Sequence, residues 1–149
     1  MKIPKGFSLI ELMITVTILF IMALIAVPSW TKLIQDNAIT TAVNQIQSIY
    51  QLTRSEALKR HEDITLTSTN TNHSWTMSTS SGALKTMTLS TDKVSITPLS
   101  GSDVSITVTS TGFAENKKLE FSWENEYRCL TIYSSGQSKV SSNSEDCNS

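Results

Sequence analysis

The stretch Lys2-Ile-Pro-Lys-Gly-Phe-Ser-Leu-Ile-Glu11 leads directly into an almost wholly apolar run that ends at Val27. Phe7–Val27 comprises 21 residues, of which only four are polar: Ser8, Glu11, Thr15 and Thr17. A helix needs about 20 mostly apolar residues to cross a bilayer, so this run is long enough for a transmembrane helix. Lys2 and Lys5 precede it, which predicts that the N-terminus stays in the cytoplasm while the chain after the run is translocated.

A cleaved secretory signal peptide is the alternative interpretation of this run. Such a peptide has a basic start, an apolar region of about 7–15 residues and a cleavage site with small residues. Here the apolar region is longer, no Ala-x-Ala site follows it, and Pro28 and Trp30 would crowd a cut. We therefore expect a membrane anchor.

Glu11 is the only charged residue in the run. An acidic residue at the centre of a membrane helix costs about 2.5–3.5 kcal/mol, and such residues usually have a partner or a function. The simpler interpretation is an interfacial glutamate, one turn into the helix, that lipid headgroups solvate and the helix dipole stabilises. Composition alone leaves both interpretations open.

The sequence Gly6-Phe7-Ser8-Leu9-Ile10-Glu11-Leu12-Met13 resembles the leader and mature start of type IV pilins and pseudopilins. The resemblance implies that a prepilin peptidase cleaves after Gly6 on the cytoplasmic side and that Phe7 is then N-methylated. It also implies that Glu11 pairs with the Phe7 ammonium of a neighbouring subunit in a helical filament. Two charges that are both costly in lipid would then neutralise each other during assembly.

The charge of the chain is close to balanced. It carries 12 basic and 13 acidic residues. Removal of residues 1–6 takes away Lys2 and Lys5, which leaves 10 basic against 13 acidic residues, a net side-chain charge of −3. A strongly basic field that would attract polyanions is therefore excluded.

The two cysteines, Cys129 and Cys147, lie near the C-terminus, in the part expected outside the cytoplasm. An oxidising compartment favours a disulfide between them. It would close a loop of about 19 residues and contribute roughly 3 kcal/mol. Two free thiols are the alternative.

Helical periodicity continues beyond the apolar run to about Arg60. Pro28 removes one backbone hydrogen bond and crowds the preceding turn, which predicts a kink or brief unwinding. After it, apolar positions recur at spacings of three and four and define one stripe: Ile34, Ala38, Ile39, Ala42, Val43, Ile46, Ile49, Tyr50, Thr53 and Ala57. We expect four segments: a leader (1–6), a transmembrane helix that becomes filament core (7–29), an amphipathic helix (30–61) and a periplasmic β-rich head (62–149).

From His61 onward, short segments rich in Thr, Val and Ile alternate with turn signals. This spacing predicts antiparallel strands that are half-buried against the helix, so the fold class is α+β with a small sheet or sandwich. Disorder is the alternative for residues 68–81, where Thr and Asn dominate, although Trp75 argues against it. The expected strands are Ile64–Ser68, Ser74–Thr79, Lys85–Ser90, Val94–Thr97, Val104–Thr109, Leu119–Trp123, Tyr127–Tyr133 and Ser138–Ser141.

A second resemblance narrows the family. Arg54-Ser55-Glu56-Ala57-Leu58-Lys59-Arg60, Ile64-Thr65-Leu66, Trp75 and Thr111-Gly112-Phe113 resemble the GspH/FimT/FimU class of minor pilins and pseudopilins. Leu130-Thr131-Ile132-Tyr133-Ser134-Ser135-Gly136 is similar to a later strand of that class. The cluster of Arg54, Glu56, Lys59 and Arg60 has a plainer interpretation than a binding patch, namely a charged helix end whose cations suit the C-terminal dipole.

Catalytic and metal-binding motifs are absent from the sequence. There is no nucleophile elbow, phosphate loop or zinc-ligand spacing, so neither an enzyme nor a cofactor is expected. His61-Glu62-Asp63 and His73 are the only candidate metal ligands, and solvated polar residues explain them more simply.

Nucleic acid binding is the second functional hypothesis. FimT-type members of the class are associated with DNA uptake through arginines in a C-terminal Gly-Arg-x-Arg stretch. This chain reads Gly136-Gln137-Ser138-Lys139 there, so one lysine replaces two arginines. DNA affinity grows with the phosphates that Lys and Arg neutralise, and nucleic acid is therefore not an expected partner.

Taken together, the two resemblances imply a minor type IV pilin. It would insert in the inner membrane as a single-pass protein with a periplasmic head and then enter a pilus near the tip. There it would prime assembly or link the tip minor pilins to the major pilin. A type II secretion pseudopilin is the alternative.

Overall fold

A computed structural model describes residues 6–69, 73–99, 104–142 and 147 of the chain. One helix, α1 (Leu9–Arg60), is followed by eight strands. The chain divides into two compact units, Met1–Ile34 and Gln35–Ser149. The strands are β1 (Ile64–Thr69), β2 (Ser74–Thr79), β3 (Gly82–Thr88), β4 (Ser95–Pro98), β5 (Ser105–Val108), β6 (Lys117–Trp123), β7 (Glu126–Ile132) and β8 (Ser138–Ser141).

The first unit contains only the N-terminal part of α1. Its described residues, 6–34, are all exposed. The helix is long and apolar enough to cross a membrane by length and composition. Helix α1 is continuous through Pro28, so the predicted brief unwinding does not occur. The helix tolerates the single missing N–H because its neighbouring turns keep their own hydrogen bonds. The kink stays a prediction.

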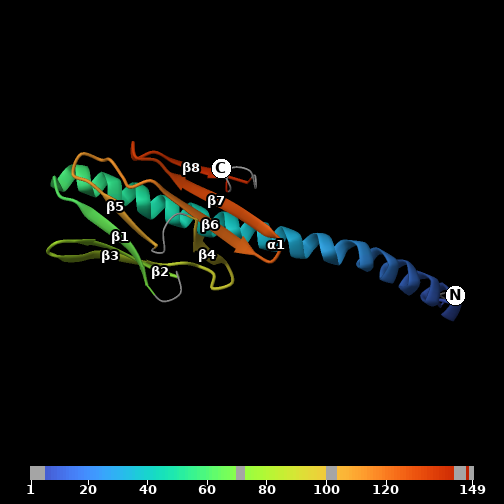
Figure 1. Cartoon of the computed structure of the whole chain (residues 1–149). Coiled ribbons are helices and arrows are strands. Elements are labelled where there is room, and N and C mark those ends of the chain that lie inside the picture. Colours follow the sequence, from blue (N-terminus) through green and yellow to red (C-terminus); the bar gives the residue numbers. More distant parts are fainter. Residues whose placement is uncertain (1–5, 70–72, 100–103, 143–146, 148–149) are drawn as a thin grey trace. The chain divides into compact units, whose positions relative to one another are not determined.

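The second unit is a head of two antiparallel sheets around the C-terminal part of α1 (Figure 1). The strand orders are β3-β2-β1-β5 and β4-β6-β7-β8. This arrangement confirms the predicted α+β class. All eight predicted strands are present, with ends that shift by at most three residues.

The largest shift is at β3, which begins at Gly82 rather than at Lys85. Thr79 and Gly82 are paired, so only Ser80 and Ser81 form the loop of the β2–β3 hairpin. A β-bulge near Met77 and Ser78 absorbs the extra residue of β3. Because β2 continues directly into β3, the predicted strand at 74–79 is confirmed and the disorder alternative is wrong for these residues.

The core forms where the helix stripe meets the inner faces of both sheets. Eight of the ten predicted stripe residues are buried; the exceptions are Ile34, which is exposed, and Ala38, which is half-buried. Ile34 is the last residue of the first unit, whose described residues are all exposed. The largest buried side chains from the sheets include Trp75 and Phe121. Burial of each such side chain stabilises the fold by roughly 1.5–3 kcal/mol.

Candidate functional site

The residues of the predicted cleavage site lie outside the helix. Gly6 and Phe7 precede the first helical residue, Leu9, and the Leu12 N–H donates the first helical bond to the Ser8 carbonyl (3.2 Å). An added Cβ at Gly6 would have no atom within 4 Å, and Phe7 is 78% exposed. The peptide bond after Gly6 is therefore open to another protein, and the cleavage and methylation stay predictions.

Glu11 lies in the first turn of α1. The threonine hydroxyls of the apolar run are satisfied by the helix itself: Thr15 donates to the Leu12 carbonyl (2.8 Å) and Thr17 donates to the Met13 carbonyl (2.7 Å). Glu11 forms no ion pair with another residue that the structure describes. The Glu11 carboxylate thus lies on an exposed apolar part of the helix with no ion-pair partner among the described residues.

Pro28 is accompanied by a small apolar notch. Ala26, Val27, Trp30 and Thr31 line it, and its volume is about 260 Å³. The Thr31 hydroxyl donates to the Pro28 carbonyl (2.9 Å) and so satisfies a polar group beside the proline. The notch lies in the exposed N-terminal part of α1.

In the head, Arg54 ties α1 to two turns. Its Nε donates to the Gly112 carbonyl (3.0 Å) and its Nη2 donates to the Ser135 carbonyl (3.2 Å). One turn earlier on the helix, the Tyr50 hydroxyl donates to the Gly136 carbonyl (2.9 Å). Burial raises the pKa of Tyr50, and nearby Arg54 opposes this effect. Arg54 is therefore a structural tie.

The remainder of the charged cluster is a helix end, as predicted. Arg60 Nε donates to the Glu56 carboxylate at 2.8 Å, and the Lys59 ammonium lies 3.9 Å from the same group. The hydrogen bond from Arg60 lowers the pKa of Glu56. Lys59 and Arg60 occupy the last turn, where cations suit the helix dipole. The assignment of Arg54 to this cluster was wrong, because its guanidinium donates to the Gly112 and Ser135 carbonyls and not to Glu56.

A second arginine, Arg128 of β7, links its sheet to the part of α1 where the head begins. It forms an ion pair with Asp36, and its Nε donates to the Thr40 hydroxyl (3.0 Å). Gln35 also donates to Glu124 in the β6–β7 turn (2.6 Å). These partners are about 90 residues apart, so no local spacing in the sequence reveals them.

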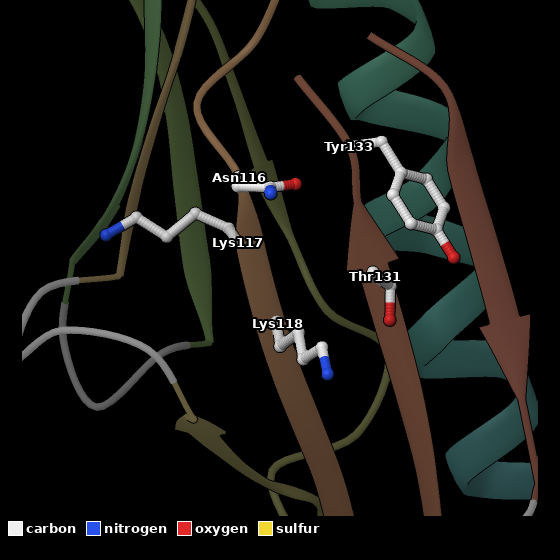
Figure 2. Close-up of a pocket in the computed structure, with 5 residues that line it drawn as sticks. All are labelled: Asn116, Lys117, Lys118, Thr131 and Tyr133. Carbon is white, nitrogen blue, oxygen red and sulfur yellow. The ribbon is translucent and has the colours of Figure 1, made fainter. Parts of the chain in front are cut away.

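A pocket of about 180 Å³ opens beside β6 and β7. Asn116, Lys117, Lys118, Thr131 and Tyr133 line it (Figure 2). Lys117 and Lys118 extend in opposite directions from β6, as successive residues of a strand do. Both lysines already interact within the chain, so the pocket carries no argument for an anion site.

The candidate metal ligands do not converge. Among the residues that the structure describes, no group of three or more His, Cys, Asp and Glu side chains is placed to hold a metal ion. Asp63 instead accepts a hydrogen bond from the Ser110 N–H (2.8 Å), and His61 is an exposed residue with a positive φ of 56° at the end of α1.

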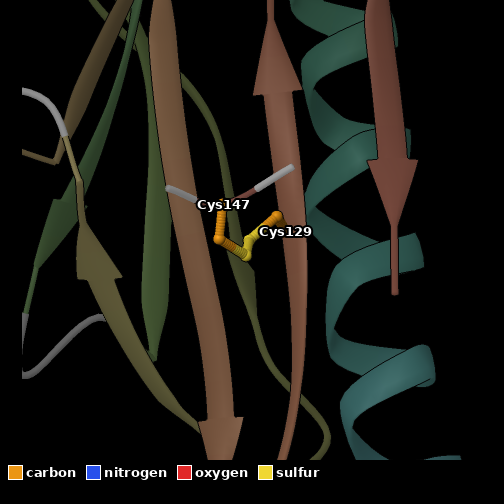
Figure 3. The surroundings of a disulfide bond; sticks show 2 residues. All are labelled: Cys129 and Cys147. Atoms are coloured by element: carbon orange, nitrogen blue, oxygen red, sulfur yellow. A yellow bond between two sulfur atoms is a disulfide. The ribbon is translucent and has the colours of Figure 1, made fainter. Parts of the chain in front are cut away.

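Cys129 and Cys147 form the expected disulfide (Figure 3). Their Cα atoms are 5.8 Å apart, within the usual range. Cys129 lies on β7 and is fully buried, and Cys147 is 6% exposed. The bond thus holds the C-terminal end of the chain to the sheet.

Two family models match the chain. Residues 42–136 match the family described as type II transport protein GspH. Residues 1–27 match the prokaryotic N-terminal methylation motif. The first match spans residues 42–60 of α1 and strands β1–β7, and the second spans the predicted leader and the apolar run.

Curated relatives match this chain over a limited stretch. Two fimbrial proteins of Pseudomonas aeruginosa are 39% identical over 62 residues, which cover 42% of this chain and 40% of each relative. The match thus spans about two fifths of the length of these relatives.

Solved structures share the fold. The type IV minor pilin FimU of Pseudomonas aeruginosa matches with a TM-score of 0.63 and 16% identity, over 71% of this chain and 90% of that chain. The minor pseudopilin EpsH from the type 2 secretion system of Vibrio cholerae matches with a TM-score of 0.52 and 18% identity, over 68% and 97%.

Proposed function

The chain belongs to the family of the type II transport protein GspH, and from this premise we propose that it is a minor type IV pilin. It is a structural, non-catalytic subunit that either primes pilus assembly or links the tip minor pilins to the major pilin. Its methylation motif and apolar N-terminal helix fit a membrane-anchored pilin. Before assembly it sits in the inner membrane with its head in the periplasm.

The single observation that supports this proposal most is the surface of residues 6–34. All of it is exposed, it is apolar almost throughout, and the carboxylate of Glu11 has no ionic partner among the described residues. An apolar surface of this extent indicates a partner. Lipid can cover it first, and the helices of other subunits can replace lipid later, because lipid tails and apolar side chains are similar surroundings.

The processing residues complete the proposal. A prepilin peptidase cleaves after Gly6, and Phe7 becomes the methylated N-terminus. Glu11 then pairs with the terminal ammonium of a neighbouring subunit. Because the carboxylate needs the amine of another subunit beyond it, we expect the chain to lie beneath the extreme tip, in contact with other minor pilins and the major pilin.

The test is Glu11→Val in cells that assemble the filament. We expect normal membrane insertion and leader cleavage, but loss of the variant from sheared filaments, because the ion pair cannot form. Glu62→Val is the matched control, since this exposed glutamate lies after the end of α1. Filaments that contain Glu11→Val at the parental level would rule out the pairing role.

A type II secretion pseudopilin is the second candidate, because the description of the matched family favours it. Deletion of the gene separates the two. Loss of surface pili in a strain that cannot retract them supports the pilus role, and normal pili with lost secretion supports the pseudopilin role.

DNA binding is not part of the proposed function. In the stretch Gly136–Lys139, Gly136 is buried beside Arg54, and the Ser138 hydroxyl accepts hydrogen bonds from Gln47 (3.2 Å) and Gln51 (3.1 Å). Lys139 is the one cation of this stretch. We expect no binding of duplex DNA in a titration at low salt; salt-sensitive binding at micromolar concentration would reverse this conclusion.

A further inference from the structure

The two sheets of the head end in four edge strands, and β3 differs from the other three. β4 and β8 have four residues each, and β4 ends at Pro98. β5 also has four residues, and the 114–115 segment partly covers it through the Val108–Ala114 bridge and a hydrogen bond from Glu115 N–H to the Thr107 carbonyl (3.3 Å). β3 has seven residues, five of them exposed, and contains no proline.

The open side of β3 presents backbone groups. Within the described part of the chain, β3 pairs only with β2, and Figure 1 shows it at the outer border of the head. The Leu89 N–H donates to the His73 carbonyl (2.8 Å), which makes 73 and 89 a hydrogen-bonded pair. Such pairs alternate along an antiparallel ladder. Thr86 and Thr88 therefore direct their N–H and C=O groups away from β2.

The side chains agree with this assignment. The hydroxyls of Thr76 and Thr86 are 3.1 Å apart, and paired side chains lie closest where the two residues do not exchange backbone bonds. The N–H and C=O groups of Thr86 and Thr88, with which no described strand pairs, are thus a template for one more strand.

Lys85 sets the chemistry of that strand. It pairs with Met77, Met77 pairs with Leu66, and Leu66 pairs with Ile106, so the four side chains form one row on the inner face of the sheet. The three apolar members of the row are buried, whereas Lys85, at the edge, is exposed. An inward-facing charge at a sheet edge opposes pairing with an arbitrary strand, because an added strand would cover the ammonium without neutralising it.

We propose that the β3 edge binds an extended, acidic segment of another subunit of the same filament. The segment pairs with the backbone of Thr86 and Thr88 and places an Asp or Glu side chain beside Lys85. Main-chain hydrogen bonds then supply affinity, and the lysine selects the partner. A second copy of this edge does not fit, because residues 82–88 contain one lysine and no acidic residue. The inference rests on the proposed function, which brings other subunits into contact with the head.

The test uses the full chain in cells that assemble the filament, with a photo-crosslinking residue introduced as Thr86→p-benzoylphenylalanine. Thr111, an exposed residue in the turn after β5, is the control position. We expect an adduct from position 86 only, with another filament subunit, and the captured peptide is an extended segment with an acidic residue. Lys85→Glu lowers the yield at least tenfold, and replacement of the captured acidic residue by lysine restores it.

Thr88→Pro, introduced in the chain that carries the crosslinking residue at position 86, gives an independent readout. It removes an N–H that points away from β2, so the head keeps its fold, and parental resistance to trypsin verifies this. We expect the same loss of contact as for Lys85→Glu. An adduct that is insensitive to Lys85→Glu, an adduct with a second copy, or filaments that contain the chain without an adduct would each overturn the inference while the proposed function stands. A parent chain that never enters filaments would overturn both.

Discussion

Arg54 and Gly112 are 58 residues apart in sequence, and a hydrogen bond of 3.0 Å joins the guanidinium Nε of the first to the carbonyl oxygen of the second. The same guanidinium also reaches the Ser135 carbonyl (3.2 Å). The end of α1, the turn before β6 and the turn before β8 are thereby held by one side chain. A planar guanidinium can serve two carbonyls at once, which a lysine ammonium cannot do in the same geometry.

Arg54→Lys therefore destabilises the head. We expect a loss of about 1.5–3 kcal/mol in the free energy of unfolding, the range for hydrogen bonds from charged donors. Urea denaturation of the full chain in detergent, followed by tryptophan fluorescence, measures it. Arg60→Lys is the control. Its ion pair with Glu56 is exposed and contributes little to stability, so we expect an unchanged urea midpoint. Equal midpoints for the two variants would contradict the tie.

Among the head glycines that the structure describes, Gly136 tolerates an added side chain least. Its φ is +77°, and an added Cβ would fall 2.1 Å from the Gly112 carbonyl oxygen and 2.7 Å from Arg54 Nε. Gly136→Ala thus combines an unfavourable backbone conformation with a collision, and we expect a loss of about 2 kcal/mol or more. Thermal unfolding of the full chain measures this loss.

The control for that prediction is Gly112→Ala. Gly112 has a similar φ of +82°, but the three atoms nearest to its added Cβ all belong to the flexible Leu58 side chain, at 3.1–3.4 Å. This variant therefore reports mainly the cost of the backbone conformation, and we expect it to lose less stability than Gly136→Ala. The opposite order would mean that the close approach to Gly112 is not maintained in solution.

Tyr50 makes the stability of the head depend on alkaline pH. Burial raises its pKa in the folded chain, so the folded state holds the phenol proton more tightly than the unfolded state does. The resulting stabilisation is fully present below the ordinary tyrosine pKa of about 10 and is lost as the pH rises through the folded value. We expect the unfolding midpoint to fall above about pH 10 and Tyr50→Phe to flatten this fall. A parental slope in Tyr50→Phe would assign the effect elsewhere.

Local patterns in the sequence predicted the helix and the strands because each has its own period. The stripe from Ile39 to Ala57 repeats at helical spacing, and strands such as β1 and β5 alternate, so burial on one face leaves a visible trace. The stripe did not reveal where the head begins. Ile34 fits the helical period yet is exposed, because the period marks one face of the helix and not how far along the helix the core extends.

The polar ties and the two-residue length of the β2–β3 loop were beyond this kind of prediction, although Ser81-Gly82 indicates a turn there. Arg54 and Arg128 find their partners across 58 to 92 residues, and no local period encodes such contacts. The loop consists of Ser80 and Ser81, which lack the usual Asn-Gly or Asp-Gly signal of a two-residue turn. Instead, the Ser81 N–H donates to the Thr79 hydroxyl (3.2 Å), which also lies 3.4 Å from the Gly82 carbonyl.

The last prediction concerns the disulfide between Cys129 and Cys147, which are 18 positions apart. Closing such a loop restricts the unfolded chain and stabilises the fold by roughly 3 kcal/mol. A reductant should therefore lower the free energy of unfolding of the full chain by about that amount in urea denaturation. The double variant Cys129→Ala/Cys147→Ala is the control: it should start at the lower stability and show no response to the reductant.

Because Cys129 is fully buried on β7, the folded chain should resist reduction until urea opens the head, and alkylation of free thiols with time measures this. Rapid alkylation of the folded chain would mean that the C-terminal end leaves the sheet without unfolding of the head.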